Sequence, residues 1–225
     1  GVWRMLEAFD AAGVPAGITL NAKLGLERRE IVDAVKERGW EIVAHNYEQG
    51  DLLTNYFAAP EKERAIIRET LRVYAEVVGR KARGWLSSSL RGTPRTPDYC
   101  AEEGLIFFCD YMNDDQPYLI QTPSGPIVAV PYSNEVNDYS VFLRRGMTTS
   151  EALDLFTEQL RELYREGKVS GRIMNIGIHP HVTGQPFRIR ALRDFLEYAK
   201  SLDGIWWATR EKIAEWYLAN HKNHV

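Results

Sequence analysis

Short apolar runs alternate with stretches of helical spacing along this 225-residue chain. A strand that is buried on both faces of a parallel sheet is apolar throughout, and two parallel neighbours need a crossover that is usually a helix. The alternation therefore predicts an α/β fold with about six parallel strands and helices outside the sheet. The predicted strands are residues 14–20, 40–44, 82–86, 105–109, 173–178 and 204–208.

The pattern changes between residues 117 and 142. Two apolar runs, 118–121 and 127–130, flank the proline- and glycine-rich sequence 122–126. Two such runs around a Pro/Gly turn predict a β-hairpin inserted into the fold. The chain contains no repeat and no linker sequence, so we expect a single domain over residues 1–225.

Composition excludes several functional classes. The chain is 44% hydrophobic and 26% charged with a formal net charge of -3, so it offers no basic surface for nucleic acid or a membrane. No apolar run approaches the roughly 20 residues of a membrane span. The two cysteines, Cys100 and Cys109, lack a C-x-x-C spacing and predict no disulfide framework. Without a signal peptide at its start, we expect a cytoplasmic protein.

Polar residues stand where several predicted strands end. His45, Ser87, Ser88, Asp110 and His179 all occupy such positions. In a parallel barrel the carboxyl ends of the strands converge on one mouth, where the chemistry is found. An open doubly wound sheet is the alternative, but the chain has no G-x-G-x-x-G sequence to support a nucleotide fold. Loops are polar in any protein, so strand ends alone do not prove a site.

The sequence 175–186 ends an apolar run with His179 and His181, two prolines and a glycine. Histidine has an unperturbed pKa near neutrality and serves as a general acid or base. We therefore interpret one of these histidines as catalytic. The alternative is that both are ordinary loop histidines in contact with water.

Four segments together resemble motifs of the polysaccharide deacetylase-like superfamily (NodB homology, carbohydrate esterase family 4). They are residues 40–45, 108–118, 130–138 and 178–188. The Asp-Asp-x-Pro-Tyr sequence at 114–118 resembles a branch with cofactor-free allantoinases, cyclic imide hydrolases and some peptidoglycan deacetylase-like proteins. The resemblance implies a distorted parallel (β/α) barrel of the polysaccharide deacetylase type, with the β-hairpin as an insertion.

Three departures from the family pattern limit what the resemblance implies. The family's aspartate-bearing strand precedes its first helix, and residues 1–6 already resemble that helix, so we expect the N-terminal part of the domain to be missing. The usual metal pair His-x-x-x-His is His45-x-x-x-Gln49 here. A neutral amide is a weaker zinc ligand than imidazole. Where the family has Arg-x-Pro, this chain has Ser87 and Ser88.

The resemblance implies roles for ten residues. The expected catalytic residues are His179, which protonates the leaving group, His45, which binds metal or orients water, and Asp110. The expected substrate-binding residues are His181, Gln49, Ser87, Ser88, Asp114, Glu135 and Asn137. His45 and Gln49 are the metal ligands if a divalent metal, zinc for example, is retained; the protein can equally need no metal.

Ordinary structural roles compete with these assignments. His45 can simply bond at its strand end, and Gln49 can face solvent. Asp110 can cap a turn, and Asp114 lies in a polar turn that need bind nothing. Glu135 and Asn137 are acceptable as loop residues alone.

The function we expect is hydrolysis of a carbon–nitrogen bond, other than a peptide bond, in a small amide, cyclic imide or ureide. The first alternative is metal-dependent deacetylation of a polysaccharide or N-acetylated sugar. The second is a non-catalytic binding or assembly protein on a degenerate barrel, since fold alone does not fix function. The polar and aromatic segment 118–142 is expected to cover the mouth of the barrel or to pair with another subunit, and we expect a homo-oligomer.

Overall fold

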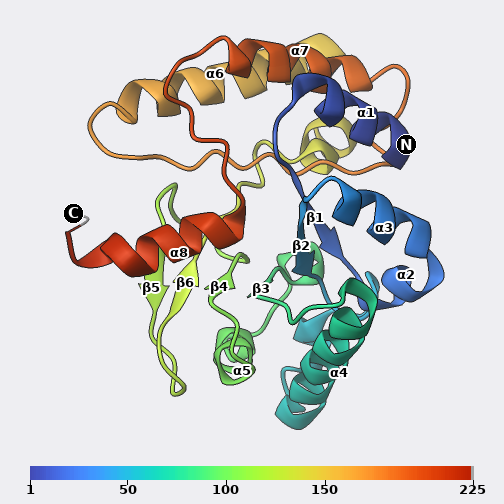
Figure 1. Cartoon of the computed structure of the whole chain (residues 1–225), viewed down its shortest axis with the longest axis vertical. Coiled ribbons are helices and arrows are strands. Elements are labelled where there is room, and N and C mark those ends of the chain that lie inside the picture. Colours follow the sequence, from blue (N-terminus) through green and yellow to red (C-terminus); the bar gives the residue numbers. More distant parts are fainter. Residues whose placement is uncertain (224–225) are drawn as a thin grey trace. The chain divides into compact units, whose positions relative to one another are not determined.

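The computed structural model describes residues 1–223 and divides into two compact units (Figure 1). Unit 1 contains Gly1–Pro15 and Tyr132–Trp207. Unit 2 contains Ala16–Pro131 and the chain from Ala208 onward. The single domain over residues 1–225 stays a prediction.

Unit 2 contains a six-stranded sheet with the order β1-β2-β3-β4-β6-β5. Neighbouring strands are parallel, except that β5 runs antiparallel to β6. The mostly parallel sheet confirms the predicted α/β class, and β5 and β6 form the predicted hairpin. Because β6 also pairs with β4, the hairpin is part of the sheet. The strands are β1 (Gly17–Leu20), β2 (Glu41–Ala44), β3 (Gly84–Trp85), β4 (Phe107–Phe108), β5 (Tyr118–Ile120) and β6 (Ile127–Ala129).

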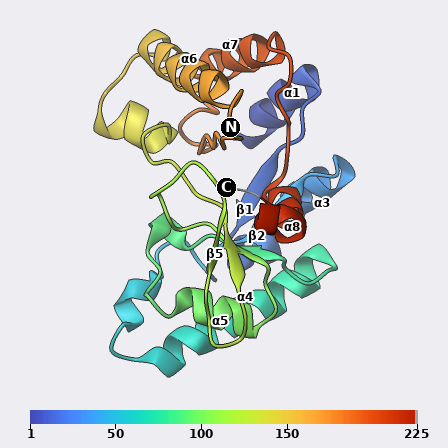
Figure 2. The ribbon, with the colours of Figure 1, turned by 90° about the vertical axis from the view of Figure 1, so that its left-hand side faces the viewer.

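The helices of unit 2 follow the sequence signals closely. The long helix α4 begins with proline in its first turn and ends at Gly79, whose φ of 83° is a left-handed value that suits glycine. It packs against α2, α3 and α5 (Figure 2). None of the helices within residues 1–223 is both long and apolar enough to cross a membrane. The helices are α2 (Ala22–Glu27), α3 (Arg29–Glu37), α4 (Pro60–Val78), α5 (Thr96–Glu102) and α8 (Arg210–Asn220), with 3₁₀ turns η1 (Leu53–Tyr56), η2 (Ser88–Leu90) and η4 (His221–Asn223).

The core of unit 2 explains why its strands are apolar. All four residues of β2 are buried, and Trp85 of β3 and both residues of β4 are buried as well. Tyr74 of α4 is also buried, and its hydroxyl donates a 2.7 Å hydrogen bond to the carbonyl of Ile42. Burial raises the pKa of Tyr74 to about 12. The sheet is therefore covered by apolar helix residues, as a parallel sheet must be.

The two cysteines lie in this core as free thiols. Cys100 and Cys109 are both buried, and neither forms a disulfide. Burial raises the pKa of the Cys109 thiol to about 12. Both residues therefore act as small apolar side chains in this core.

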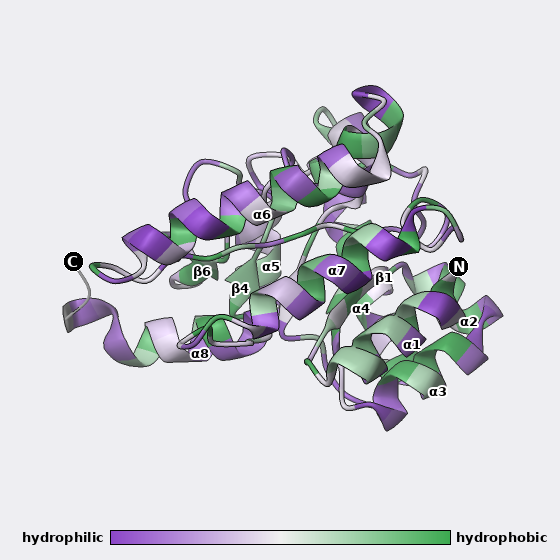
Figure 3. Ribbon diagram, turned by 90° about the horizontal axis from the view of Figure 1, so that it is seen from above, coloured by the Kyte–Doolittle hydropathy of each residue, from purple (hydrophilic) through white to green (hydrophobic). Residues whose placement is uncertain are grey.

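Unit 1 is a layer of helices. Helices α6 and α7 lie side by side, and α1 packs against α7 (Figure 1). Helix α6 begins with a capping box between Thr148 and Glu151. Hydrophilic and hydrophobic residues alternate along α6 (Figure 3). The elements are α1 (Val2–Ala12), a π-helix labelled η3 (Tyr139–Arg144), α6 (Thr149–Glu166) and α7 (Ile189–Lys200).

The apolar faces of these helices form two clusters. In one, the rings of Phe156 and Phe195 meet edge to face with centroids 6.0 Å apart. Val182, which directly follows the histidine sequence, is fully buried in that cluster. In the other, Met5 of α1 packs with Leu192 of α7. The histidine loop is therefore anchored in the core of unit 1.

Two segments differ from the prediction. Residues 173–178 and 204–208 form no strands in the part of the chain that the structure describes. Periodicity marks an apolar run as extended, but a strand also needs a neighbour that completes its hydrogen bonds. In segment 173–178 the carbonyl oxygen of Gly177 accepts a hydrogen bond from the backbone nitrogen of Asp138 at 2.8 Å, in a loop and not in a strand.

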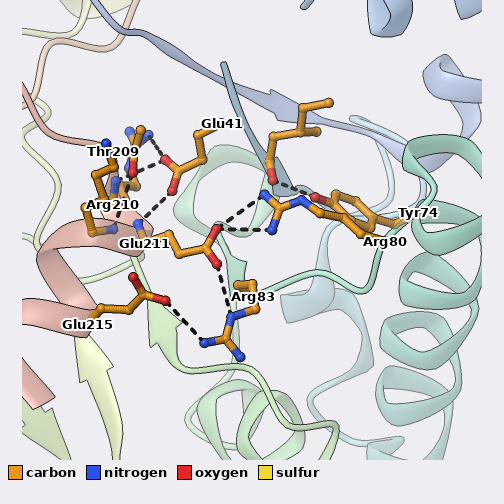
Figure 4. A network of polar contacts seen from close by, with 10 residues as sticks. Glu41, Tyr74, Arg80, Arg83, Thr209, Arg210, Glu211 and Glu215 are labelled. Atoms are coloured by element: carbon orange, nitrogen blue, oxygen red, sulfur yellow. Dashed lines mark hydrogen bonds and ion pairs between the residues drawn. The ribbon is translucent and has the colours of Figure 1, made fainter. Parts of the chain in front are cut away.

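Helix α8 is attached to the sheet of unit 2 by a network of charged residues (Figure 4). The buried carboxylate of Glu41 accepts hydrogen bonds from the backbone nitrogens of Arg210, at 3.0 Å, and Glu211, at 2.7 Å. A carboxylate satisfies the free N–H groups of a helix N-terminus and complements its dipole. Glu211 in turn pairs with Arg80 at 3.2 Å and Arg83 at 3.1 Å.

Replacing Glu41 should therefore destabilise the protein. In Glu41→Gln a neutral amide has one acceptor oxygen for the two N–H groups and leaves its own NH₂ group buried without a partner. We expect a loss of about 1–3 kcal/mol in the free energy of unfolding. Denaturant titration measures it, with Glu215→Gln in the same helix as control, because Glu215 is half exposed and its ion pair with Arg83 is 3.5 Å long. Equal losses in both variants would contradict a special role for Glu41.

Candidate active site

His179 is held by Asp138 in unit 1. Its ring Nδ1 lies 2.6 Å from Oδ1 of Asp138, and its backbone nitrogen donates to Oδ2 at 2.7 Å. The Asp138 side chain is fully buried, whereas 40% of the His179 side chain is exposed. Because a carboxylate only accepts, Nδ1 carries the proton and Nε2 is the ring atom available for chemistry. The pair therefore has the orientation of a general acid–base histidine and its carboxylate partner.

Thr183 completes the binding of the Asp138 carboxylate. Its hydroxyl donates to Oδ2 at 2.7 Å and its backbone nitrogen at 3.2 Å. With both bonds from His179, the carboxylate accepts four hydrogen bonds, which compensates for its burial. The loop 179–183 is thus wrapped around one carboxylate, and the direction of the His179 ring is fixed.

The position of Asp138 is set by the π-helix that follows it and by the close packing of Gly177 against the loop before it. The π-helix η3 begins directly after it, and such helices are frequent at functional sites. Asn137 accepts from the backbone nitrogen of Tyr139 at 2.9 Å and donates to the Tyr132 hydroxyl at 2.6 Å. A Cβ on Gly177 would lie 1.8 Å from that hydroxyl oxygen, so only glycine fits there. Asn137, predicted to bind substrate, holds this loop together.

Two other predicted residues of unit 1 are accessible. His181 is exposed, and its ring meets that of His179 edge to face with centroids 5.6 Å apart. The Tyr139 ring lies 6.4 Å from His179 in a similar orientation. Glu135 is exposed and accepts from the Ser133 hydroxyl at 3.2 Å. Substrate binding by His181 and Glu135 stays a prediction.

In unit 2 the structure brings His45 and Gln49 together. His45 directly follows β2, and its Nδ1 lies 2.6 Å from the carbonyl oxygen of Leu86, which follows β3. Its Nε2 lies 3.1 Å from the side-chain oxygen of Gln49, and the side-chain nitrogen of Gln49 donates to the hydroxyl of Ser89 at 3.5 Å. Sequence analysis did not single out Ser89, although it follows the two serines that it did name.

Ser87 and Ser88 are fully buried and make internal contacts. The hydroxyl of Ser87 accepts from the indole N–H of Trp85 at 2.9 Å. The hydroxyl of Ser88 accepts from Asn21 at 3.2 Å. Both side chains therefore stabilise the strand end, and their predicted contact with substrate is untested.

Asp110 is buried at the end of β4. Its Oδ1 accepts from the backbone nitrogen of Ser87 at 2.7 Å, whereas its Oδ2 is buried without a hydrogen-bond partner. Burial raises the pKa of Asp110 to about 6, and hydrogen bonding from Ser87 limits the rise. A raised pKa suits an acid–base group that works near neutrality.

A shallow hollow of about 460 Å³ adjoins Asp110 and is lined by Tyr111, Met112, Asn113 and Tyr118. Asp114 lies next to it in sequence and is exposed. Its carboxylate accepts from the backbone nitrogens of Asp115, at 2.8 Å, and Gln116, at 3.0 Å. Asp114 therefore organises a turn, and its predicted contact with substrate is untested.

The residues present do not make up a zinc site. Within residues 1–223 no three His, Cys, Asp or Glu side chains gather in a geometry that could hold a metal ion. His45 and Gln49 offer one imidazole and one neutral amide, whereas zinc sites use three or four protein ligands. The donor set therefore does not fit the metal that the family resemblance implies, and no reaction step is derived through one.

The raised pKa of Asp110 predicts a pH-dependent stability. Its pKa is about 6 in the folded protein against an ordinary 3.8, so ionisation costs folding free energy. The cost is absent below about pH 4, grows as the pH rises, and is complete above about pH 6. Relative to Asp110→Asn, the wild type should lose on the order of 3 kcal/mol across this range. Denaturant titrations at several pH values test this, with the surface variant Asp33→Asn as control. A constant difference between wild type and Asp110→Asn would contradict it.

The short distance between His45 and Gln49 predicts how a metal site could be restored. In Gln49→His a second imidazole replaces the amide beside Nε2 of His45. We expect zinc to bind at least roughly tenfold more tightly than to the wild type, since imidazole is the better ligand. Competition with a chromophoric chelator measures this, and Asp33→His controls for an added surface histidine. Equal affinities in all three proteins would show that residues 45 and 49 cannot share an ion.

Comparisons with known proteins agree with this architecture. No family model matches the chain. A protein of Schizosaccharomyces pombe (strain 972 / ATCC 24843), named as a polysaccharide deacetylase, is 30% identical over 241 residues, covering 98% of this chain and 73% of that protein. A crystal structure of a probable polysaccharide deacetylase from Pseudomonas aeruginosa PAO1 matches 98% of this chain and 73% of its own, with a TM-score of 0.90 and 29% identity.

The structure of Puue allantoinase matches equally well, with a TM-score of 0.90 and 31% identity over 98% of this chain and 72% of that chain. The agreement confirms the fold that the sequence predicts, a parallel α/β structure of the polysaccharide deacetylase type. It also confirms the prediction of an enzyme. The chain belongs to the polysaccharide deacetylase-like superfamily and is a hydrolase of that superfamily.

Proposed function

We propose that the protein hydrolyses a carbon–nitrogen bond, other than a peptide bond, in a small amide, cyclic imide or ureide. The observation that carries the proposal is the hydrogen bond of 2.6 Å between His179 and the buried Asp138. The similarity to an allantoinase, whose name denotes a ureide substrate, supports the small cyclic class. His179 is the group that the reaction needs most, because an amide nitrogen leaves only when it is protonated.

The chemistry follows from the orientation of the ring. Nε2 of His179 accepts a proton from the water as the water adds to the carbonyl carbon, and the tetrahedral intermediate then collapses with breakage of the carbon–nitrogen bond. His179, protonated on both ring nitrogens, gives its Nε2 proton to the departing nitrogen. Asp138 stabilises the imidazolium and holds Nδ1–H throughout. Because 40% of the His179 side chain is exposed, a substrate can reach Nε2.

The other predicted residues have narrower roles in this proposal. The roles of the residues in unit 2 stay predictions: His45 would orient water or substrate, and Asp110, with its pKa near 6, would exchange a proton or bond a polar group of the substrate. Among the residues predicted to bind substrate, Gln49, Asp114, Glu135 and His181 have exposed side chains. A cytoplasmic location, a homo-oligomer and the absence of nucleic-acid and membrane partners stay predictions.

Metal-dependent deacetylation of a polysaccharide or N-acetylated sugar is the second candidate. It is favoured by the deacetylase names of the Schizosaccharomyces pombe and Pseudomonas aeruginosa relatives. It needs a metal-held water, and the described donors of this chain do not supply an adequate ligand set. Zinc-dependent acetate release from N-acetylglucosamine oligomers would select it. A non-catalytic binding protein would turn over neither class of substrate.

Two variants test the proposal. His179→Ala removes the acid, and Asp138→Asn keeps the shape but favours the wrong ring tautomer. We expect each to lower kcat on cyclic imides or ureides by roughly 100-fold or more. The matched control is His221→Ala, which removes a histidine of the C-terminal 3₁₀ turn. Turnover that survives in both site variants would rule out this acid.

A further inference from the structure

Two arginines of unit 1 contact aromatic rings of the π-helix η3. The guanidinium carbon of Arg144 lies 5.5 Å from the centre of the Tyr139 ring. The guanidinium carbon of Arg188 lies 4.9 Å from the ring centre of Phe142 and 4.7 Å from that of Phe187. A cation over the face of an aromatic ring is attracted to it. Both positive charges are therefore held at the aromatic residues of one short helix.

The geometry of the π-helix explains why Arg144 reaches Tyr139. In a π-helix the hydrogen bonds join residues five apart, as in the 3.0 Å bond from the backbone nitrogen of Arg145 to the carbonyl of Ser140. Residues 139 and 144 are therefore neighbours here, whereas the neighbours in an α-helix are three and four apart. The Tyr139 ring in turn lies 6.4 Å from the ring of His179. The wide turn thus places a cation against the ring that adjoins His179.

The N–H groups of these two arginines are available to a ligand. A contact with a ring face occupies none of the five N–H donors of a guanidinium group. Within residues 1–223 the side chains of Arg144 and Arg188 form neither a hydrogen bond nor an ion pair. Arginines elsewhere in unit 1 do pair with carboxylates, namely Arg161, Arg165, Arg172 and Arg190. Because Arg144 is also exposed, a small molecule can reach its donors.

We propose that Arg144 binds a carboxylate of the substrate, so that the protein acts on an anionic amide, imide or ureide. The planar fork of a guanidinium group matches a carboxylate and can donate two parallel hydrogen bonds to it. Arg188 adds positive potential at the same helix, which attracts an anion. This assignment rests on the proposed function and adds the charge of the substrate to it. Arg144 is a binding residue, because the carboxylate takes no part in the bond changes beside His179.

A matched pair of substrates tests the need for a charge. Hydantoin-5-acetate carries a carboxymethyl group on a cyclic ureide, and 5-isobutylhydantoin carries an apolar group of the same shape. We expect the wild type to hydrolyse the first with a kcat/KM at least about tenfold higher. The preference should shrink at high salt, because salt screens exposed charges. Equal kcat/KM for the two substrates, or a preference for 5-isobutylhydantoin, overturns the inference and leaves the proposed function standing.

Variants of Arg144 assign the preference to one side chain. Arg144→Gln should raise KM for hydantoin-5-acetate about tenfold and change kcat less than about twofold, because the carboxylate is bound equally in the ground and transition states. KM for 5-isobutylhydantoin should not change. Arg144→Lys keeps the charge, so its KM for hydantoin-5-acetate should rise at most about threefold.

The matched control is Arg145→Gln. It removes the same charge from the next residue, which is exposed and has no ring contact within residues 1–223. Its KM for hydantoin-5-acetate should stay within about twofold of the wild-type value. An equal rise of KM in Arg144→Gln and Arg145→Gln overturns the inference, because the net charge alone would then explain the effect.

Binding without turnover separates this inference from the proposed function. By calorimetry, hydantoin-5-acetate should bind to His179→Ala with a Kd about tenfold lower than to the double variant His179→Ala/Arg144→Gln. That result supports the carboxylate site even if the wild type hydrolyses no amide, imide or ureide, an outcome that overturns the proposed function alone. Equal affinity for both proteins, or no binding to either, overturns the inference.

Discussion

Buried carboxylates that accept hydrogen bonds from distant parts of the chain hold both units of this protein in shape. In unit 1, Asp138 accepts from the backbone nitrogens of His179 and Thr183. In unit 2, Glu41 does the same for the start of α8. A buried charge is costly unless its lone pairs are used, so each carboxylate fixes the position of the segment that it binds. The direction of the His179 ring is a direct consequence of this constraint.

Periodicity predicted the parts of the fold whose structure is set by burial. Strand β2 could be predicted because all four of its residues are buried. The hairpin of β5 and β6 could be predicted because proline and glycine occupy its turn. Segment 173–178 was equally apolar, yet it is not a strand in the described structure. The hydrophobicity of a segment predicts that the segment is buried. Whether it forms a strand also depends on a neighbouring strand, which cannot be identified from the sequence of that segment alone.

The candidate site was predictable by region more than by residue. His45, Gln49 and His179 were predicted as site residues from the sequence, and the structure gives His45 a contact with Gln49 and His179 a contact with Asp138. Asp138 was missed because a carboxylate in the polar loop 132–138 resembles any turn residue until its four donors are known. The serines at positions 87–89 could not be told apart from the sequence either. In the structure, Ser89 has a left-handed backbone conformation and is exposed, whereas the two serines before it are buried.

Gln49 stands where the family resemblance implies a metal-binding histidine, and this difference changes both the metal ligands and the hydrogen-bond donors at this position. An imidazole at this position would offer a lone pair to a cation, whereas the Gln49 amide also carries N–H groups, one of which donates to the hydroxyl of Ser89. A metal ion and an N–H donor stabilise the same developing negative charge on a carbonyl oxygen. Loss of a ligand therefore need not mean loss of catalysis, because the residue that replaces it can take over the electrostatic part of the metal's task. A strained cyclic imide or ureide is the class of substrate for which this weaker stabilisation suffices, since ring opening relieves strain that an open-chain acetamide lacks.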